Sequence, residues 1–387
     1  MFEIMEVPSQ EAVIKVIGVG GCGGNAVDHM IANGVKGVEF VCANTDMQAL
    51  KRTQARIQLQ LGSDVTKGLG AGANPEVGRQ AALEDRDRII ELITGTDMLF
   101  LTAGMGGGTG TGAAPVVAEI AREMGILTVA VVTKPFAFEG KRQRVAMEGL
   151  EALSQHVNSL IVIPNDKLMQ VLGNQVTLDQ AFRAANDVLH GAVSGISEII
   201  SCPGMINVDF ADVRTVMSEA GMAMMGSAKA VGTDRARMAA EQAVASPLLE
   251  DIDIADARGA VVNISASKTS MQLQEVYDVM DVINTFMADS ATKIIGTAYD
   301  DELGDELRVT IVATGLGKAS SRVMPKPLSV VMSATGTDGG HAAGAVNYEE
   351  LDQPAVMRRR RDQTVEAMRQ SGVDMLDIPA FLRKQAD

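Results

Sequence analysis

The sequence predicts an α/β protein whose first half is a doubly wound, Rossmann-like domain with a parallel sheet. Two observations support this fold class. Five short runs rich in β-branched residues are apolar at consecutive positions, which is typical of parallel strands covered by helices on both faces. Amphipathic stretches of helical period separate these runs, so strands and helices alternate. After about residue 203 the order of elements changes and indicates a second, α+β domain.

The elements of the first half follow from these patterns in chain order. The predicted strands are AVIKVIGVG from Ala12, GVEFVCANTD from Gly37, DMLFLTAG from Asp97, LTVAVVTKP from Leu127 and SLIVIPN from Ser159. The predicted helices are GGNAVDHMIANG, PEVGRQAALEDRDRIIELITG, AAPVVAEIAREMG and KRQRVAMEGLEALSQHV. Because doubly wound sheets bind ligands at the carboxyl ends of their strands, we expect a ligand site at that edge.

A long helical pattern from Val176 to Cys202 separates the two halves, and Pro203-Gly204 ends it. The later strands are predicted from Gly221, Ala257, Thr292 and Glu306, with helices around 236–246 and 272–289, which suggests a mixed sheet. We therefore expect a ligand-binding domain at 1–175, a central helix at 176–203 and an α+β domain at 204–317.

The end of the chain has a different composition. Residues 318–372 are rich in Ser, Gly, Ala, Pro and Thr, and they lack the apolar area needed to offset ordering entropy, so a disordered linker is predicted. Its run Arg358–Arg361 is interpreted as a solvated segment, with weak contact to anionic lipid as the alternative. Residues 373–387 become apolar again and predict a docking peptide, or else a helix fragment that packs on the body.

Charge and composition exclude several classes of protein. The formal net charge is −15, whereas a nucleic-acid binder needs a basic face. No apolar run approaches the roughly 18 residues of a membrane span. The first ten residues lack the pattern of a signal peptide. Three cysteines without CxxC spacing indicate reduced thiols in a cytosolic protein.

Glycine-rich segments follow two of the predicted strands and precede helices. The segment 18–25 satisfies GxGxxG, which alone also fits a dinucleotide-binding enzyme or a tight turn without a ligand. The segment 104–112 has six Gly and two Thr in nine residues, a composition that suits a nest of backbone N–H groups for phosphate. A third stretch, 68–75, either closes over a terminal phosphate or is a mobile loop. The absence of GxxxxGK[ST] excludes a P-loop.

The motif GGGTGTG between a strand and a helix resembles the signature of the tubulin/FtsZ superfamily of GTPases. The chain is similar to the bacterial FtsZ family of cell-division GTPases in VIGVGGCGGNAV, ANTD, GLGAGANPEVG, TAGMGGGTGTGAAP, VVTKPFAFEG, IPNDKL, NVDFADVRTVMSE and LDIPAFLRKQAD. These motifs cover residues 12–317 and the last dozen, and leave only the linker uncovered. The resemblance implies the tubulin/FtsZ fold, binding of GTP and GDP with Mg²⁺, and hydrolysis of GTP.

The resemblance also implies which residues bind the nucleotide. It assigns phosphate contacts to Gly20, Gly21, Cys22, Gly23, Gly24, Asn25, Gly104, Gly106, Gly107, Gly108, Thr109 and Gly110. It assigns two further loops to Asn44 and Asp46 and to Ala71, Gly72 and Ala73, the latter sensing the γ-phosphate. Thr133, Pro135 and the ribose-contacting Glu139 complete this side. The family usually has Gly or Ala at position 22, and we expect the small Cys22 to preserve binding.

One loop departs from the family pattern. The family has an Arg four residues after the equivalent of Glu139, but here that position is Gln143 and the loop is one residue shorter. We assign the role of that arginine to Arg142.

Two groups of residues have both a structural and a functional interpretation. Phe182 and Asn186 lie four residues apart on one helix face; the sequence alone favours a core Phe, whereas the resemblance implies that they stack and read guanine. Asp209 and Asp212 suit a helix cap and a helix-dipole partner. The resemblance instead makes Asn207, Asp209 and Asp212 a catalytic loop that orients water near a phosphate.

The length of the central helix constrains how these groups meet. About 23 helical residues span roughly 35 Å, so one subunit cannot bring the acids to its own phosphate loops. The resemblance implies head-to-tail stacking, in which Asp209 and Asp212 complete the neighbour's site. A heterologous contact that does not close forms a filament. The resemblance further implies a cytoplasmic protein at the mid-cell division ring, bound to an FtsA-like membrane tether and other division proteins through Asp374–Lys384, without direct membrane insertion.

Two other function classes compete with this reading. A nicotinamide-dependent oxidoreductase would use Gly18–Gly23, but it leaves the second glycine-rich loop unexplained and lacks an evident proton-transfer residue. A non-hydrolysing structural relative would keep the fold, and the presence of Asn207, Asp209 and Asp212 argues against it.

Overall fold

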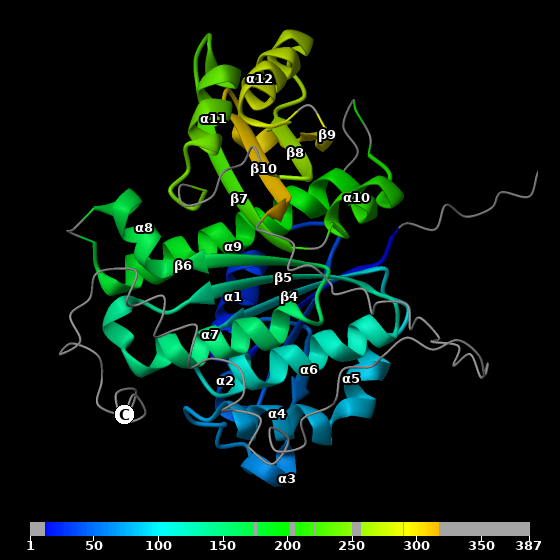
Figure 1. The fold of residues 1–387 in the computed structure, drawn as a ribbon, viewed down its shortest axis with the longest axis vertical. Helices are drawn as coiled ribbons and strands as arrows, with labels where there is room; N and C mark the ends of the chain where they lie inside the picture. Colours follow the sequence, from blue (N-terminus) through cyan, green and yellow to red (C-terminus); the bar gives the residue numbers. More distant parts are fainter. Residues whose placement is uncertain are drawn as a thin grey trace, which may run out of the picture. The chain divides into compact units, whose positions relative to one another are not determined.

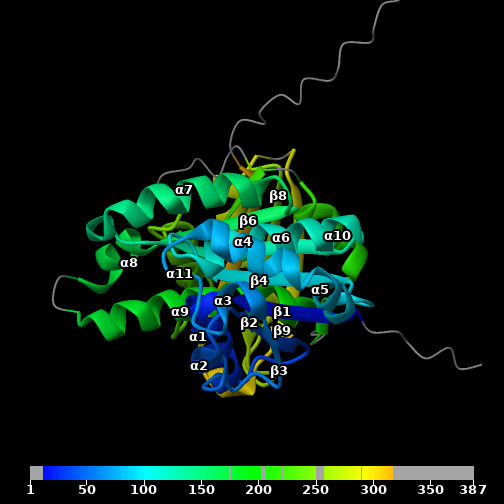
Figure 2. The same ribbon diagram turned by 90° about the horizontal axis from the view of Figure 1, so that it is seen from below.

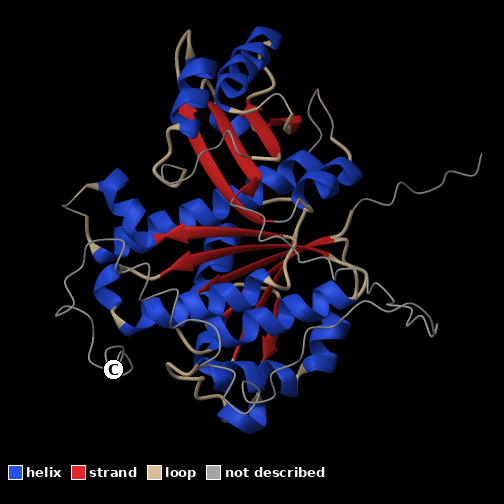
Figure 3. Cartoon of the chain, in the orientation of Figure 1, coloured by secondary structure: helices blue, strands red, loops and turns tan. Residues whose placement is uncertain are grey.

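The computed structural model describes residues 12–173, 176–201, 206, 208–219, 221–249, 257–288 and 290–316. Within them, ten strands form one sheet in the order β3-β2-β1-β4-β5-β6-β7-β10-β8-β9 (Figures 1 and 3). The predicted linker, the C-terminal peptide and Asn207 lie outside the described residues.

The first six strands are parallel, as predicted from their apolar runs. They are β1 (Ile14–Val19), β2 (Glu39–Asn44), β3 (Ile57–Gln60), β4 (Met98–Gly104), β5 (Leu127–Lys134) and β6 (Ser159–Pro164). Five of them confirm the sequence prediction. The edge strand β3 was not predicted, because four residues with polar side chains at alternate positions give no apolar run.

Helices cover both faces of this parallel part. They are α1 (Gly20–Ala32), α2 (Met47–Leu50), α3 (Ser63–Thr66), α4 (Pro75–Glu84), α5 (Arg86–Ile93), α6 (Thr109–Glu123), α7 (Lys141–Ser154) and α8 (Asn165–Leu172), with a 3₁₀ turn at Ala137–Glu139. Side chains alternate between the faces: Val16 and Phe100 share one core with α1, while Ile17 and Leu101 share another with α6. In Figure 2 the strands lie between α6 and α7 on one side and α1 and α9 on the other.

The helix predicted over 75–95 is interrupted at Asp85. The Asp85 carboxylate accepts a hydrogen bond from the backbone N–H of Gly62 at 2.7 Å and pairs with Arg88 at 2.8 Å. This contact with the loop at Gly62 fixes Asp85 as the junction between α4 and α5. The local sequence pattern could not predict the junction, because the contact is with a residue far away in the chain.

The long helix α9 (Leu178–Ser201) confirms the predicted central helix. Its buried residues Leu189, Val193 and Ile196 recur at helical spacing and pack into the core with α1. Near its end, Glu198 accepts hydrogen bonds from Arg308 at 2.9 Å and from Asn263 and Ser265 at 3.1 Å. These contacts attach α9 to the second half of the sheet.

The second half is mixed, as the sequence suggested. It contains α10 (Phe210–Met217), β7 (Gly221–Ala230), α11 (Arg235–Val244), β8 (Gly259–Ala266), α12 (Leu273–Phe286), β9 (Thr292–Tyr299), a 3₁₀ turn (Asp301–Leu303) and β10 (Leu307–Leu316). β10 is antiparallel to β7 and β8, and β8 is parallel to β9. Three residue pairs join β7 to β6, so the sheet continues through both halves. The domain boundaries at 175 and 204 stay a prediction. None of the described helices is long and apolar enough to cross a membrane.

His190 on α9 makes the stability of this fold depend on pH. Burial, followed by the positive charge of Arg308, lowers the pKa of His190 to about 4. The unfolded chain therefore binds more protons than the folded one between about pH 6.5 and 4, and stability falls as pH falls through this window. We expect the free energy of unfolding to be about 1 kcal/mol lower at pH 5.5 than at pH 7 from this group. Urea unfolding of wild type and His190→Gln at both pH values checks this; equal pH dependence of the two proteins would contradict it.

Candidate functional site

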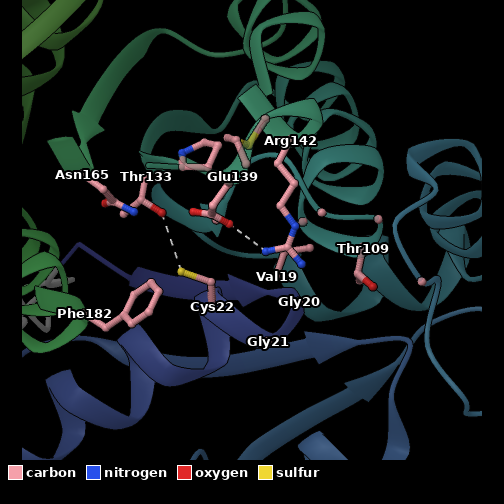
Figure 4. A pocket seen from close by; sticks show the side chains of 17 residues that line it. Val19, Gly20, Gly21, Cys22, Thr109, Thr133, Glu139, Arg142, Asn165 and Phe182 are labelled. Carbon is pink, nitrogen blue, oxygen red and sulfur yellow. Dashed lines mark hydrogen bonds and ion pairs between the residues drawn. The ribbon is translucent and has the colours of Figure 1, made fainter. Parts of the chain in front are cut away.

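A cavity of about 280 Å³ lies at the carboxyl edge of the parallel strands (Figure 4). Its lining includes Gly104 at the end of β4, Thr133 near the end of β5 and Asn165 directly after β6. The first residues of α1 and α6 and a loop residue, Gly72, also line it. The expected ligand edge of the sheet therefore carries a cavity.

Two helices begin at this cavity with their backbone donors uncapped. Neither Val19, which precedes α1, nor Gly108, which precedes α6, supplies a side-chain cap, and neither helix has an acidic residue in its first turn. The first N–H groups of a helix have no partner within it, and the helix dipole adds positive potential there. Two such ends facing one cavity favour a polyanionic ligand.

Two glycines allow these helices to come together. Gly20 has φ of 75° where β1 turns into α1, in the left-handed region that favours glycine. Gly108 lies so close to the 71–73 loop that a Cβ atom there would be 2.3 Å from the carbonyl oxygen of Gly72. Thr109 is held by a 2.7 Å hydrogen bond between its hydroxyl and that of Thr45. The start of α6, the 71–73 loop and the segment that carries Thr45 therefore depend on one another for their positions.

Charged and thiol side chains line the other wall. Arg142 donates a hydrogen bond to Glu139 at 2.8 Å, and Glu139 also accepts one from the backbone N–H of Phe136 at 3.0 Å. Arg142 lines the cavity, whereas Gln143 does not. Cys22 lies 3.6 Å from the Thr133 hydroxyl, and burial raises the pKa of its thiol, which keeps it neutral.

An aromatic ring and an amide complete the cavity. Phe182 of α9 has 43% of its surface exposed, and its ring lies edge-on to Phe136 with the centroids 5.7 Å apart. An exposed ring beside a polar cavity can stack on a planar ligand. Asn165 is only 5% exposed, and its Oδ1 atom has no hydrogen-bond partner. A buried polar atom without a partner at a cavity wall is an available ligand contact.

Most residues expected to bind the nucleotide line this cavity or a smaller one beside it. The larger cavity collects Gly20, Gly21, Cys22, Gly72, Gly104, Gly107, Gly108, Thr109, Gly110, Thr133, Pro135, Glu139, Arg142 and Phe182. The smaller one, of about 150 Å³, shares Gly20 and Gly21 with it and adds Gly24, Asn25 and Asn44.

Six expected residues line neither cavity, namely Gly23, Asp46, Ala71, Ala73, Gly106 and Asn186. Asp46 caps α2 by accepting hydrogen bonds from the N–H groups of Gln48 and Ala49. Three residues that line the larger cavity were missed by the sequence analysis: Val19, Met105 and Asn165. Asn165 stands in the quoted motif IPNDKL directly after a strand, which is the signal that could have found it.

The two described acids of the expected catalytic loop lie at the opposite edge of the sheet. Asp209 caps α10 by accepting a hydrogen bond from the N–H of Asp212 at 2.7 Å, and both residues are exposed. On the same helix, Arg214 donates to the carbonyl oxygen of Gly125, just before β5 begins. Phe182, near the start of α9, lines the cavity, whereas Ser201, at its end, contacts Gly37 before β2. Figures 1 and 2 show α10 at the far end of α9 from α8.

Comparisons with known proteins cover both halves of the chain. The model for the GTPase domain of the Tubulin/FtsZ family matches residues 13–173, and that for the C-terminal domain of the FtsZ family matches residues 221–317. The cell division protein FtsZ of Coxiella burnetii is 58% identical over 389 residues, 99% of each chain, and that of Pseudomonas aeruginosa 57% over 399 residues, 100% of each. The solved FtsZ dimer of M. jannaschii has a TM-score of 0.77 at 44% identity, covering 81% of this chain and 90% of that one.

Proposed function

This chain belongs to the tubulin/FtsZ family of GTPases, and from that premise we propose that it binds GTP in the cavity at the carboxyl edge and hydrolyses it between stacked subunits. The filaments so formed organise bacterial cell division. One observation carries the proposal: the cavity lies at one edge of the sheet, and Asp209 and Asp212 lie together at the opposite edge.

The phosphates bind at the uncapped starts of α1 and α6. Their backbone N–H groups, with the Thr109 hydroxyl, supply donors without any lysine. The second glycine-rich loop faces the first across the same cavity, an arrangement for which a nicotinamide-dependent enzyme gives no reason.

The base and ribose bind between Phe182, Asn165, Glu139 and Arg142. Phe182 offers an exposed ring face for guanine, and Glu139 offers a carboxylate for a ribose hydroxyl. Asn186 lies one helical turn after Phe182, on the same side of α9, and reads the edge of the base.

The phosphates, rather than a cage of protein side chains, would hold Mg²⁺. Among the described residues, no three His, Cys, Asp or Glu side chains gather as a metal site. Mg²⁺ usually retains several waters and takes phosphate oxygens as ligands. A cavity that binds phosphates but whose described residues include no cluster of metal-binding side chains therefore fits this ion. When bound, the ion neutralises phosphate charge during transfer.

Hydrolysis takes place where the exposed acids of one subunit face the cavity of the next. Asp209 is the N-cap of α10, and its side chain accepts a hydrogen bond from the backbone N–H of Asp212, which lies three residues later on the first turn. Carboxylates in this position orient the attacking water, and Asn207, outside the described residues, belongs to the same loop.

The proposal is tested by phosphate release from GTP with Mg²⁺ over a range of protein concentrations, with sedimentation in parallel. We expect specific activity to rise steeply above a threshold concentration and protein to sediment only with GTP. Constant activity per molecule without sedimentation would show a site complete within one chain, contrary to the proposal.

Asn165→Ala is expected to weaken GTP binding about tenfold, the effect of one lost hydrogen bond to a buried amide. The melting temperature of the nucleotide-free protein should not fall, because the change removes a buried polar atom that has no partner. Titration with a fluorescent GTP analogue measures the affinity. Ser159→Ala is the matched control, since Ser159 Oγ is also buried without a partner but lies at the other end of β6. Equal affinity of Asn165→Ala and wild type would remove Asn165 from the site.

The C-terminal peptide attaches the filament to its partners. Leu376, Ile378 and Phe381 supply apolar anchors for an FtsA-like tether, within the stretch Asp374–Lys384. The tether holds the filament at mid-cell, on the cytoplasmic face of the membrane.

Deleting residues 373–387 is expected to abolish tether binding and to leave GTP-dependent sedimentation unchanged, because the described body contains both faces of the proposed subunit contact. Co-sedimentation with and without the tether measures both properties. A truncated chain that no longer assembles would indicate that the peptide packs on the body.

A further inference from the structure

The two ends of the proposed nucleotide site are carried by different helices. α1 begins at the cavity with Gly20 and Gly21, and α9 brings Phe182 to it. The two helices pack against each other and share one apolar core. A nucleotide that contacts both helices therefore binds well only at one relative placement of α1 and α9.

A polar contact joins these helices away from the cavity. His29 of α1 has its Nε2 atom 2.7 Å from Oδ1 of Asp187 on α9. The His29 ring also lies edge-on to His190, at a centroid distance of 6.2 Å and an interplanar angle of 88°. Asp187 and His190 lie three positions apart on one helix face. A single α1 side chain thus contacts α9 at two points.

We propose that His29 and Asp187 are a positioning pair for the nucleotide, a role that rests on the proposed function. Neither residue lines the cavity. His29 lies nine residues after Gly20, about 14 Å along α1, and Asp187 lies five residues after Phe182, about 8 Å along α9. A hydrogen bond between the helices, added to their apolar packing, favours one angle between them. It thereby favours one spacing between the phosphate-binding start of α1 and the base-binding face of α9.

The exposure of the pair limits the size of the effect. The His29 side chain is 23% exposed and that of Asp187 is 67% exposed. An exposed hydrogen bond contributes little, so loss of this contact is expected to give about a fivefold weaker affinity for a ligand that touches both helices. A ligand that touches only the phosphate loops does not depend on the pair.

The test compares GDP with inorganic tripolyphosphate by calorimetry, using the full chain. His29→Ala, Asp187→Ala and the double variant should each weaken GDP binding about fivefold, with the double variant no weaker than the singles. Tripolyphosphate affinity should change less than twofold, and His29→Gln, which keeps a donor, should recover most of the GDP affinity. Asp179→Ala is the control, because Asp179 pairs within α9, with Arg183 at 2.9 Å.

The other outcomes overturn the proposal. Unchanged GDP affinity in His29→Ala would show that the pair has no role in binding. Parallel loss of GDP and tripolyphosphate affinity, with a lower melting temperature of the nucleotide-free protein, would show a contact that serves folding alone. Failure of the wild-type chain to bind GDP would instead refute the proposed function, and the positioning role with it.

Discussion

Gly108→Ala is expected to reduce nucleotide affinity by at least about 100-fold, because the added methyl group overpacks the contact between two phosphate loops. Its Cβ atom would lie 2.3 Å from the Gly72 carbonyl oxygen and 3.0 Å from the Ala71 Cβ atom. Backbone atoms cannot rotate out of the way as a flexible side chain can, so the 71–73 loop or the start of α6 must move. Either movement opens the proposed phosphate site.

Equilibrium titration with fluorescent GDP measures this loss. Gly107→Ala is the matched comparison: Gly107 lines the same cavity, but its added Cβ would meet no atom within 4 Å, so a much smaller loss is expected. The melting temperature of each nucleotide-free variant separates local displacement from unfolding. A Gly108→Ala protein that binds as tightly as wild type would show that the loop contact does not form the phosphate site.

Asp212→Ala is expected to bind GTP with wild-type affinity and to lose at least about 100-fold in turnover, the usual contribution of a positioned proton-transfer or water-orienting group. Its cavity is intact, because Asp212 lies on α10 at the opposite edge of the sheet. Binding is measured by titration and turnover by phosphate release. Near-normal turnover would withdraw Asp212 from catalysis.

Mixing the two variants tests whether the site is shared. A Gly108→Ala subunit lacks nucleotide but keeps its acids, and an Asp212→Ala subunit lacks the acid but keeps its nucleotide. A completed site forms wherever the nucleotide of an Asp212→Ala subunit faces the acid of a Gly108→Ala subunit. Activity that appears only on mixing is the expected result. An inactive mixture that still co-sediments would mean that both halves of the site must come from the same chain.

The parallel half of the fold could be predicted from the sequence because its strands are buried on both faces. Buried parallel strands read as continuous apolar runs, and glycine-rich turns mark their carboxyl ends. β3 escaped this pattern because it is an edge strand of four residues. The break at Asp85 escaped it because its cause is the N–H of Gly62, 23 residues earlier.

The candidate site could be predicted in part, and the reason differs between its components. The phosphate loops have a distinctive glycine-rich composition, so the glycines that line the cavity and Thr109 were predicted from the sequence. Asn165 was not found, because its distinguishing property is burial without a hydrogen-bond partner, which exists only in the folded chain. Arg142, by contrast, was chosen over Gln143 from the sequence, and it lines the cavity whereas Gln143 does not.

The length of α9 gives any row of these subunits two chemically unequal ends. In the proposed arrangement, the last cavity at one end faces no acid, so its nucleotide stays intact, and the last acids at the other end face no substrate. A row of any length therefore holds one completed site fewer than it has subunits. Short rows therefore leave a larger share of their nucleotide unhydrolysed than long rows do. The hydrolysis rate per subunit rises with the number of subunits in the row and approaches a maximum as the row grows.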